Sequence, residues 1–102
     1  MPRYEIRVAA SAMADIKKIS EWWSKHRTAA PRLFDRELDV ILDLLEHHPG
    51  IGRRITLRAH GEVRSIVLHR SQHVVMYRLL EEERAVWIVR VRHTRRRPLQ
   101  TR

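Results

Sequence analysis

One stretch organises this chain: Ala85-Val86-Trp87-Ile88-Val89-Arg90-Val91-Arg92-His93-Thr94-Arg95-Arg96-Arg97-Pro98. Its first half alternates with the period of two that is typical of a β-strand, in which successive side chains point to opposite faces. One face would carry Trp87, Val89, Val91 and His93. The other would carry Val86, Ile88, Arg90 and Arg92. The strand begins apolar on both faces and ends in arginines and a histidine, so we interpret its basic end as the functional surface of the protein.

Length and composition set the limits of the fold. With 102 residues, of which 43% are hydrophobic, the chain can bury one modest core, and we expect a single domain over residues 1–102. The sequence has no cysteine, which excludes disulfides, thiolate metal sites and cysteine nucleophiles. No apolar run is long enough for a signal peptide or a membrane span. We therefore expect a cytoplasmic protein with no membrane partner.

The charge is distributed unevenly along the chain. Residues 1–49 contain eight basic and eight acidic residues, whereas residues 50–102 contain thirteen arginines and four glutamates, so the second half carries the whole net charge of +9. Arginine suits bidentate contacts with phosphate or carboxylate better than lysine does. The pattern predicts an anionic partner. The open alternative is a solvated surface on an arginine-rich chain.

The segments before the final strand predict an α+β domain. Residues 4–8 alternate as a short strand, and an amphipathic helix follows with Ser11 as its N-cap. A second helix would open at 29–31, with Pro31 in its first turn, and would end at 47–50. Residues 51–61 resemble a loop, and the runs 63–69 and 74–80 predict an antiparallel hairpin. The expected order is strand, helix, helix and three strands, with the helical hairpin packed on an antiparallel sheet.

No standard catalytic, cofactor or metal motif is present, so we expect neither a cofactor nor a metal. His47 and His48 are adjacent on the second helix and would point apart, which disfavours a metal site. A cationic array remains, in which Arg64, Arg78 and Arg90 or Arg92 could converge near His93. Such an array could bind phosphate. If the imidazole served as acid or base it could instead cleave RNA, and the catalytic residues would then be His93, Arg64 and Arg90.

Several segments in their order resemble the RelE/ParE superfamily of bacterial toxins, and the resemblance covers nearly the whole chain. The segments that carry it are Leu44-Leu45-Glu46-His47-His48-Pro49-Gly50-Ile51-Gly52, Gly61-Glu62-Val63-Arg64, Val74-Val75-Met76-Tyr77-Arg78 and Ile88-Val89-Arg90-Val91-Arg92-His93-Thr94-Arg95-Arg96. The proline-glycine-x-glycine helix exit and the valine-x-His-x-Arg-Arg ending look more like the ParE branch. That branch is associated with inhibition of DNA gyrase, whereas the RelE branch cleaves messenger RNA on the ribosome.

The resemblance implies the toxin of a type II toxin-antitoxin system, neutralised by a cognate antitoxin in a hetero-oligomer. We expect a gyrase inhibitor rather than an enzyme, because no lysine follows Lys25 and no tyrosine follows Tyr77, whereas RelE-like nucleases generally have such residues. The alternatives are a ribosome-dependent messenger RNA endonuclease and a non-toxic nucleic-acid-binding module. The expected target-binding residues are Arg90, Arg92, His93, Arg95, Arg96 and Arg97. An acidic antitoxin that folds on binding would contact Trp22, Leu33, Val40, Leu44, Arg64 and Arg78.

Overall fold

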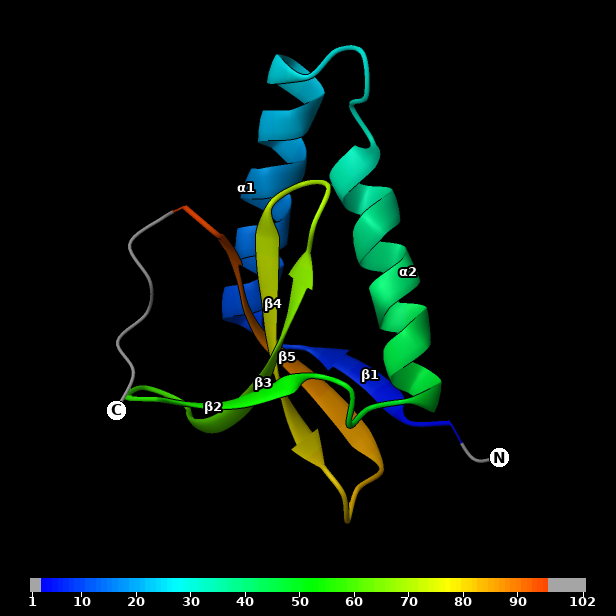
Figure 1. The fold of residues 1–102 in the computed structure, drawn as a ribbon, viewed down its shortest axis with the longest axis vertical. Helices are drawn as coiled ribbons and strands as arrows, with labels where there is room; N and C mark the ends of the chain where they lie inside the picture. The colour runs from blue at the N-terminus through cyan, green and yellow to red at the C-terminus, as the bar shows by residue number, and fades with distance from the viewer. Residues whose placement is uncertain (1–2, 96–102) are drawn as a thin grey trace.

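The computed structural model describes residues 3–95 of the chain as two helices and one five-stranded sheet (Figure 1). The elements in chain order are β1 (Glu5–Val8), α1 (Ala10–His26), α2 (Leu33–His47), β2 (Arg53–Leu57), β3 (Gly61–Leu68), β4 (His73–Leu80) and β5 (Ala85–His93). The strands lie in the order β1-β5-β4-β3-β2. Neither described helix is both long and apolar enough to cross a membrane.

The predicted α+β class and the helical hairpin are confirmed, with two differences in the sheet. The helices are followed by four strands rather than three, because residues 53–57 form β2, antiparallel to β3. Its two arginines and the flanking glycines hid the short alternation of Ile55 and Leu57, as is common for an edge strand. The sheet is also mixed, because β1 pairs with β5 in parallel.

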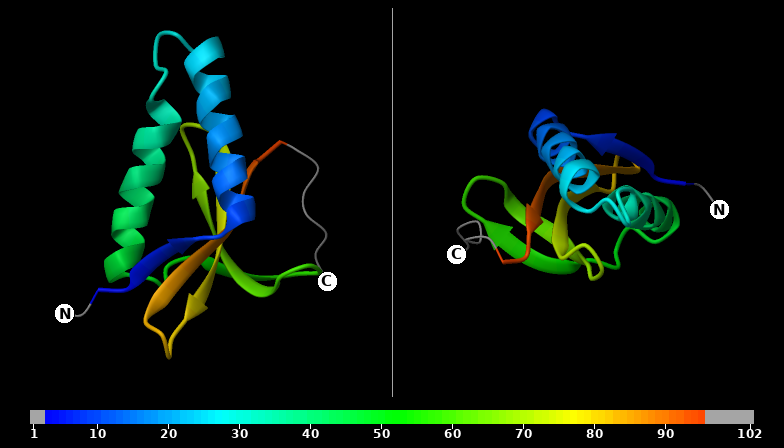
Figure 2. Two further views of the ribbon diagram at one scale, coloured as in Figure 1. Left: turned by 180° about the vertical axis from the view of Figure 1, so that it is seen from behind. Right: turned by 90° about the horizontal axis from the view of Figure 1, so that it is seen from above.

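The main core lies between the sheet and the two helices, which cover the same face of the sheet (Figure 2). The apolar faces of both helices supply it: Ala12 and Trp23 are buried on α1, and Phe34, Leu38 and Leu45 are buried on α2. A smaller cluster of Leu57, Val63, Met76 and Val89 is buried separately. The β2–β3 hairpin therefore adds a second, smaller packed region to the domain.

The helix starts differ from the sequence predictions. The N-cap of α1 is Ala9, whose side chain makes no capping bond, and Ser11 lies inside the helix. α2 begins at Leu33, so Pro31 precedes the helix instead of lying in its first turn. Because the backbone before a proline disfavours the helical region, the chain turns over residues 28–32 before the second helix can start.

A β-bulge in β5 changes the predicted faces of this strand. Arg90 pairs with Met76, and Ile88 pairs with Tyr77. Val89 is therefore an extra residue that has no cross-strand partner on β4. An extra residue reverses the alternation beyond it. Val91 therefore packs in the main core with Ile88, whereas the uninterrupted pattern placed it on the opposite face. His93 follows Val91 onto the helix-covered side.

The N-terminal half of α1 closes the edge of β5 where the short strand β1 ends. The Ala9 N–H donates to the Ile88 carbonyl at 2.9 Å. The Ser11 hydroxyl donates to the Val89 carbonyl at 2.8 Å, and the Val91 N–H donates to the Asp15 carboxylate at 3.0 Å. These bonds satisfy backbone groups that an open sheet edge would leave unpaired. They also fix α1 over the bulge.

The entry into β2 depends on a close approach between Gly52 and Tyr77. The buried Tyr77 hydroxyl donates to the Pro49 carbonyl at 2.7 Å and accepts the Gly52 N–H at 2.9 Å. A Cβ atom at Gly52 would lie 2.6 Å from that hydroxyl oxygen, whereas a Cβ atom at Gly50 would meet nothing within 4 Å. The backbone of Gly52 does not adopt a positive φ. Glycine is therefore needed at this position for space and not for backbone conformation.

The β3–β4 turn is attached to α2 by one carboxylate. Glu37 accepts the backbone N–H groups of Arg70 and Ser71 at 2.8 and 2.9 Å, and the Ser71 hydroxyl at 2.7 Å. Partial burial raises the pKa of Glu37, but these hydrogen bonds outweigh burial and leave the pKa below its ordinary value of 4.5. The ionised form is therefore the one that holds the turn.

We predict that Gly52→Ala lowers the free energy of unfolding by about 1–3 kcal/mol, because the added methyl group overpacks the site against Tyr77. Gly50→Ala is the matched control, two residues away in open space, and its effect should stay within about 0.5 kcal/mol. Urea unfolding monitored by circular dichroism measures both. Equal stability of the two variants would contradict the role given to Gly52.

We predict that Glu37→Gln lowers stability by about 1–2 kcal/mol near pH 7 and changes its pH dependence. Because folding depresses the pKa of Glu37, its contribution is complete above the unfolded-state pKa and is lost as the pH falls through the folded-state value. The difference between wild type and variant should thus shrink below about pH 4. Urea titrations across this range test it, with the exposed Glu62→Gln as control. A constant difference at all pH values would exclude the linkage.

Candidate functional site

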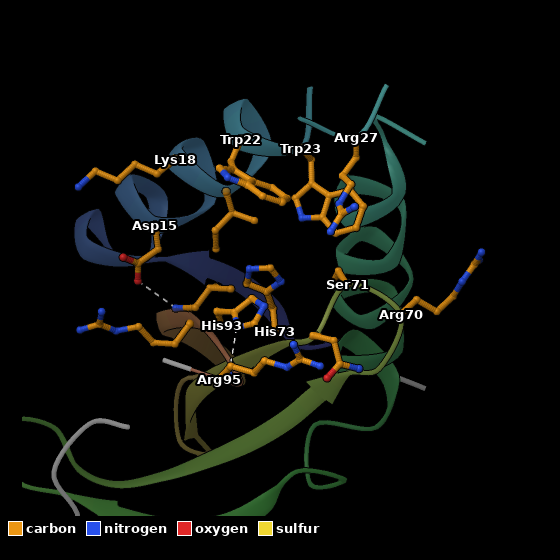
Figure 3. Close-up of a pocket in the computed structure, with 14 residues that line it drawn as sticks. Asp15, Lys18, Trp22, Trp23, Arg27, Arg70, Ser71, His73, His93 and Arg95 are labelled. Atoms are coloured by element: carbon orange, nitrogen blue, oxygen red, sulfur yellow. Dashed lines mark hydrogen bonds between the residues drawn. The ribbon is translucent and has the colours of Figure 1, made fainter. Parts of the chain in front are cut away.

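A cleft of about 690 Å³ lies between α1, the β3–β4 turn and the end of β5 (Figure 3). Its aromatic lining residues are Trp22, Trp23, His73 and His93. Its cationic lining residues are Lys18, Arg27, Arg70, Arg92 and Arg95. Asp15 is the one acidic residue of this lining. The basic end of β5 therefore opens into a concave, aromatic and strongly positive site. Of its α1 residues, Trp22 was predicted, as an antitoxin contact, whereas Asp15, Lys18 and Trp23 were not predicted as site residues.

A row of rings connects this cleft to the main core. The rings of Phe34 and His73 lie 5.1 Å apart between centroids, and the rings of His73 and His93 also lie 5.1 Å apart, in an edge-on arrangement. His73 is buried, and the register of β4 and β5 places it directly opposite His93. The row fixes His93 against packed side chains at the cleft wall.

The hydrogen bond of His93 defines its tautomer. Its Nδ1 accepts the Arg95 backbone N–H at 3.0 Å. A backbone N–H can only donate, so the neutral ring in this arrangement carries its proton on Nε2. His93 can then donate a hydrogen bond from Nε2, while its accepting nitrogen is already occupied. Such an imidazole suits anion binding better than proton abstraction.

Arg90 is engaged in a partly buried ion pair. Its guanidinium contacts both carboxylate oxygens of Asp15, at 2.8 and 3.1 Å, and the two side chains are only 23% and 16% exposed. The same carboxylate accepts the Val91 N–H. The structure thus uses Arg90 to join β5 to α1. The sequence had marked Arg90 as a target-binding or catalytic candidate.

The other arginines of the predicted array do not converge on His93. Arg64 donates to the carbonyls of Gly50 and Gly52 at 3.0 and 2.9 Å, near the entry into β2. Arg78 is exposed on β4 and pairs in register with Trp87. Arg92 and Arg95 alone among the predicted arginines of residues 3–95 line the cleft with His93. Arg96 and Arg97 lie outside the described residues.

The apolar residues expected to contact an antitoxin fall into separate places. Trp22 is 45% exposed beside the cleft, stacked on His26 at 4.9 Å with Arg27 5.5 Å from its ring centroid. Val40 and Leu44 are 65% and 39% exposed on α2. Leu33 is half-buried against the main core. The structure therefore offers two distinct apolar surfaces, one on α1 and one on α2.

The model for "ParE toxin of type II toxin-antitoxin system, parDE" matches residues 6–98. A search of curated proteins found no significant match. Among solved structures, the chain is similar to the crystal structure of the toxin-antitoxin complex RelBE2 from Mycobacterium tuberculosis. The TM-score is 0.62 and the identity 23%, over 89% of this chain and 98% of that chain.

Two further solved structures share the fold. The archaeal RelE-RelB complex from Pyrococcus horikoshii OT3 matches with a TM-score of 0.61 and 17% identity, over 95% of this chain and 100% of that chain. The isolated E. coli RelE toxin matches with a TM-score of 0.53 and 20% identity, over 92% of this chain and 87% of that chain. The family match covers nearly the whole chain, so the chain belongs to the ParE toxins of type II toxin-antitoxin systems.

Proposed function

We propose that this toxin arrests growth by inhibiting DNA gyrase, without cleaving messenger RNA. The observation that carries the proposal is that His93, Arg64 and Arg90 form no catalytic group. Acid-base cleavage needs a base within hydrogen-bonding reach of the proton that it removes. Here Nδ1 of His93 is occupied, Arg90 is paired with Asp15, and Arg64 is bonded to two carbonyls elsewhere. Membership of the ParE family supports the same target.

The proposed target-binding surface is the basic end of β5. Arg92, His93 and Arg95 lie on the cleft, and Arg96 and Arg97 follow them in the sequence. A surface of this kind binds through many modest, salt-screened contacts rather than through one essential group. Arg90 stabilises this surface indirectly, because its ion pair with Asp15 joins β5 to α1. A target of this type places the protein in the cytoplasm.

We also propose that an acidic antitoxin neutralises the toxin in a hetero-oligomer. The M. tuberculosis and P. horikoshii relatives were each solved as a toxin-antitoxin complex. In this chain, the exposed side chains of Val40 and Leu44 on α2 offer apolar area. They line a groove whose other lining residues are both basic and acidic: Arg3, Asp43, Glu46, His47 and His48. Arg3 is paired with Glu46 at 3.2 Å. An amphipathic segment could bury the apolar side chains in this groove, and the net charge of +9 favours an acidic partner.

We predict that the purified toxin blocks supercoiling by gyrase or traps cleaved DNA, and leaves ribosome-bound messenger RNA intact. His93→Ala should retain inhibition within about threefold, because the imidazole contributes one contact among several. Supercoiling assays and primer-extension assays on translating ribosomes measure the two activities. The matched control is His60→Ala, outside the cleft lining.

Cleavage of ribosome-bound messenger RNA that disappears in His93→Ala would contradict the gyrase proposal. Salt-sensitive binding to bare nucleic acid, with neither activity, would instead assign the chain as a simple binding module.

We predict that Val40→Asp combined with Leu44→Asp prevents neutralisation by the antitoxin but preserves toxicity. The substitutions place like charge opposite an acidic segment and remove apolar area from the contact, so the affinity should fall at least about tenfold. Growth rescue by the co-expressed antitoxin and affinity measured by calorimetry test this. Met13→Asp, at an exposed apolar position on α1, is the control. Full rescue of the double variant would exclude the α2 surface.

A further inference from the structure

Two buried hydrogen-bond donors border the cleft without acceptors. The indole Nε1 of Trp23 and the guanidinium Nε of Arg92 are both inaccessible, and neither has a hydrogen-bond partner among residues 3–95. Trp23 is only 9% exposed, and its indole nitrogen is turned toward the interior of the cleft (Figure 3). A buried donor without an acceptor destabilises the folded state, and few occur in a native protein. Two such donors on one cleft indicate that a bound molecule supplies the missing acceptors.

The charge around the cleft defines the kind of acceptor. Five basic side chains line it, and Asp15 is the one carboxylate in the lining. Asp15 is already committed to Arg90 and to the Val91 N–H, so it cannot neutralise the rim. His93 adds a third donor, its Nε2–H, because its Nδ1 is occupied. The site therefore presents donors and positive charge, and it suits an anion rich in oxygen acceptors.

The number of donors favours a phosphate over a carboxylate. A phosphate monoester has three terminal oxygens and a charge between about −1.5 and −2 near neutral pH, whereas a carboxylate has two oxygens and one charge. The cleft volume of about 690 Å³ is far larger than one anion and lies within the range of small-molecule sites. Trp22 is half-exposed on the cleft wall, where its ring stacks on His26 and lies under Arg27, so a planar base packs on it when Arg27 moves aside.

We propose that this cleft binds the terminal phosphate of a nucleotide. The phosphate accepts from Trp23 Nε1 and His93 Nε2, and the base lies along the Trp22 wall. Arg92, which leaves β5 on the face opposite His93, contributes positive charge at the edge of the cleft. Both unpaired nitrogens are covered in the structure, so the exposed rim side chains, such as Arg27 and Arg95, rearrange when the phosphate enters. The phosphate comes either from a free mononucleotide or from the phosphorylated end of a nucleic-acid strand. The cleft overlaps the proposed target-binding surface at Arg92, His93 and Arg95, but the inference does not rest on the identity of the toxin's target.

The test measures binding to the full chain made by cell-free synthesis, using calorimetry and tryptophan fluorescence. The probes are AMP, adenosine, inorganic phosphate, and one oligonucleotide with a 5′-phosphate or a 5′-hydroxyl. We expect AMP to bind with a dissociation constant below about 1 mM, and adenosine to bind at least about tenfold more weakly. Stronger binding of the phosphorylated oligonucleotide than of AMP identifies a strand end as the source, and the reverse identifies a free nucleotide.

The variants isolate the contributions of Trp23 and Arg92. Trp23→Phe keeps an aromatic ring but removes the N–H, and Arg92→Gln removes the guanidinium; each should weaken AMP at least about tenfold. The matched controls Trp87→Phe and Arg78→Gln, outside the cleft lining, should not change AMP binding. Circular dichroism confirms that every variant is folded.

Several results would overturn the proposal. They are AMP and the phosphorylated oligonucleotide both failing to bind, equal binding of adenosine and AMP, or unchanged AMP binding in folded Trp23→Phe and Arg92→Gln. The proposal would also be overturned if a glutamate-rich peptide bound to the cleft, lost this binding in Trp23→Phe and Arg92→Gln, and no phosphate probe bound. Such a peptide result would assign the cleft to a protein partner.

Discussion

The arrangement of this domain depends on how the edge of β5 is closed where β1 ends. β1 covers β5 only as far as the Val8–Ile88 pair. Beyond it, Ser11 and Asp15 on α1 take over as side-chain substitutes for a neighbouring strand. A row of open backbone groups there would invite pairing with another chain. The carboxylate of Asp15 also neutralises Arg90, so this one side chain contributes to edge protection, to helix placement and to the pairing of a partly buried charge.

That closure also shapes the cleft. The bulge at Val89 turns the end of β5, so His93 faces its cross-strand neighbour His73 on the side of the helices. Glu37 holds the β3–β4 turn against α2 and completes the opposite wall. Because these contacts come from separate elements, the cleft exists only in the assembled fold. Its donors are held by packed side chains, which is the condition for preorganised anion binding.

The sequence predicted those features of the fold that depend on the local periodicity of apolar residues. The two helices and the β3–β4 hairpin followed from apolar spacing, and the class followed from element order. It missed β2, whose Arg53 and Arg54 obscure a short edge strand. The bulge could not be predicted, because Val89 fits an uninterrupted alternation equally well. The Asp15–Arg90 pair spans 75 residues, and no local pattern reports a contact that only tertiary packing creates.

The arginines of this chain divide into structural and available groups, and composition alone could not separate them. The planar guanidinium of Arg90 grips both oxygens of Asp15, and one nitrogen of Arg64 reaches two carbonyls. Lysine's ammonium could not reproduce the fork of Arg90. Part of the arginine excess therefore reflects internal hydrogen bonding rather than an anionic partner. The cations that line the cleft come from α1, a turn and the end of β5, so the anion-binding potential of the molecule is a property of its tertiary structure.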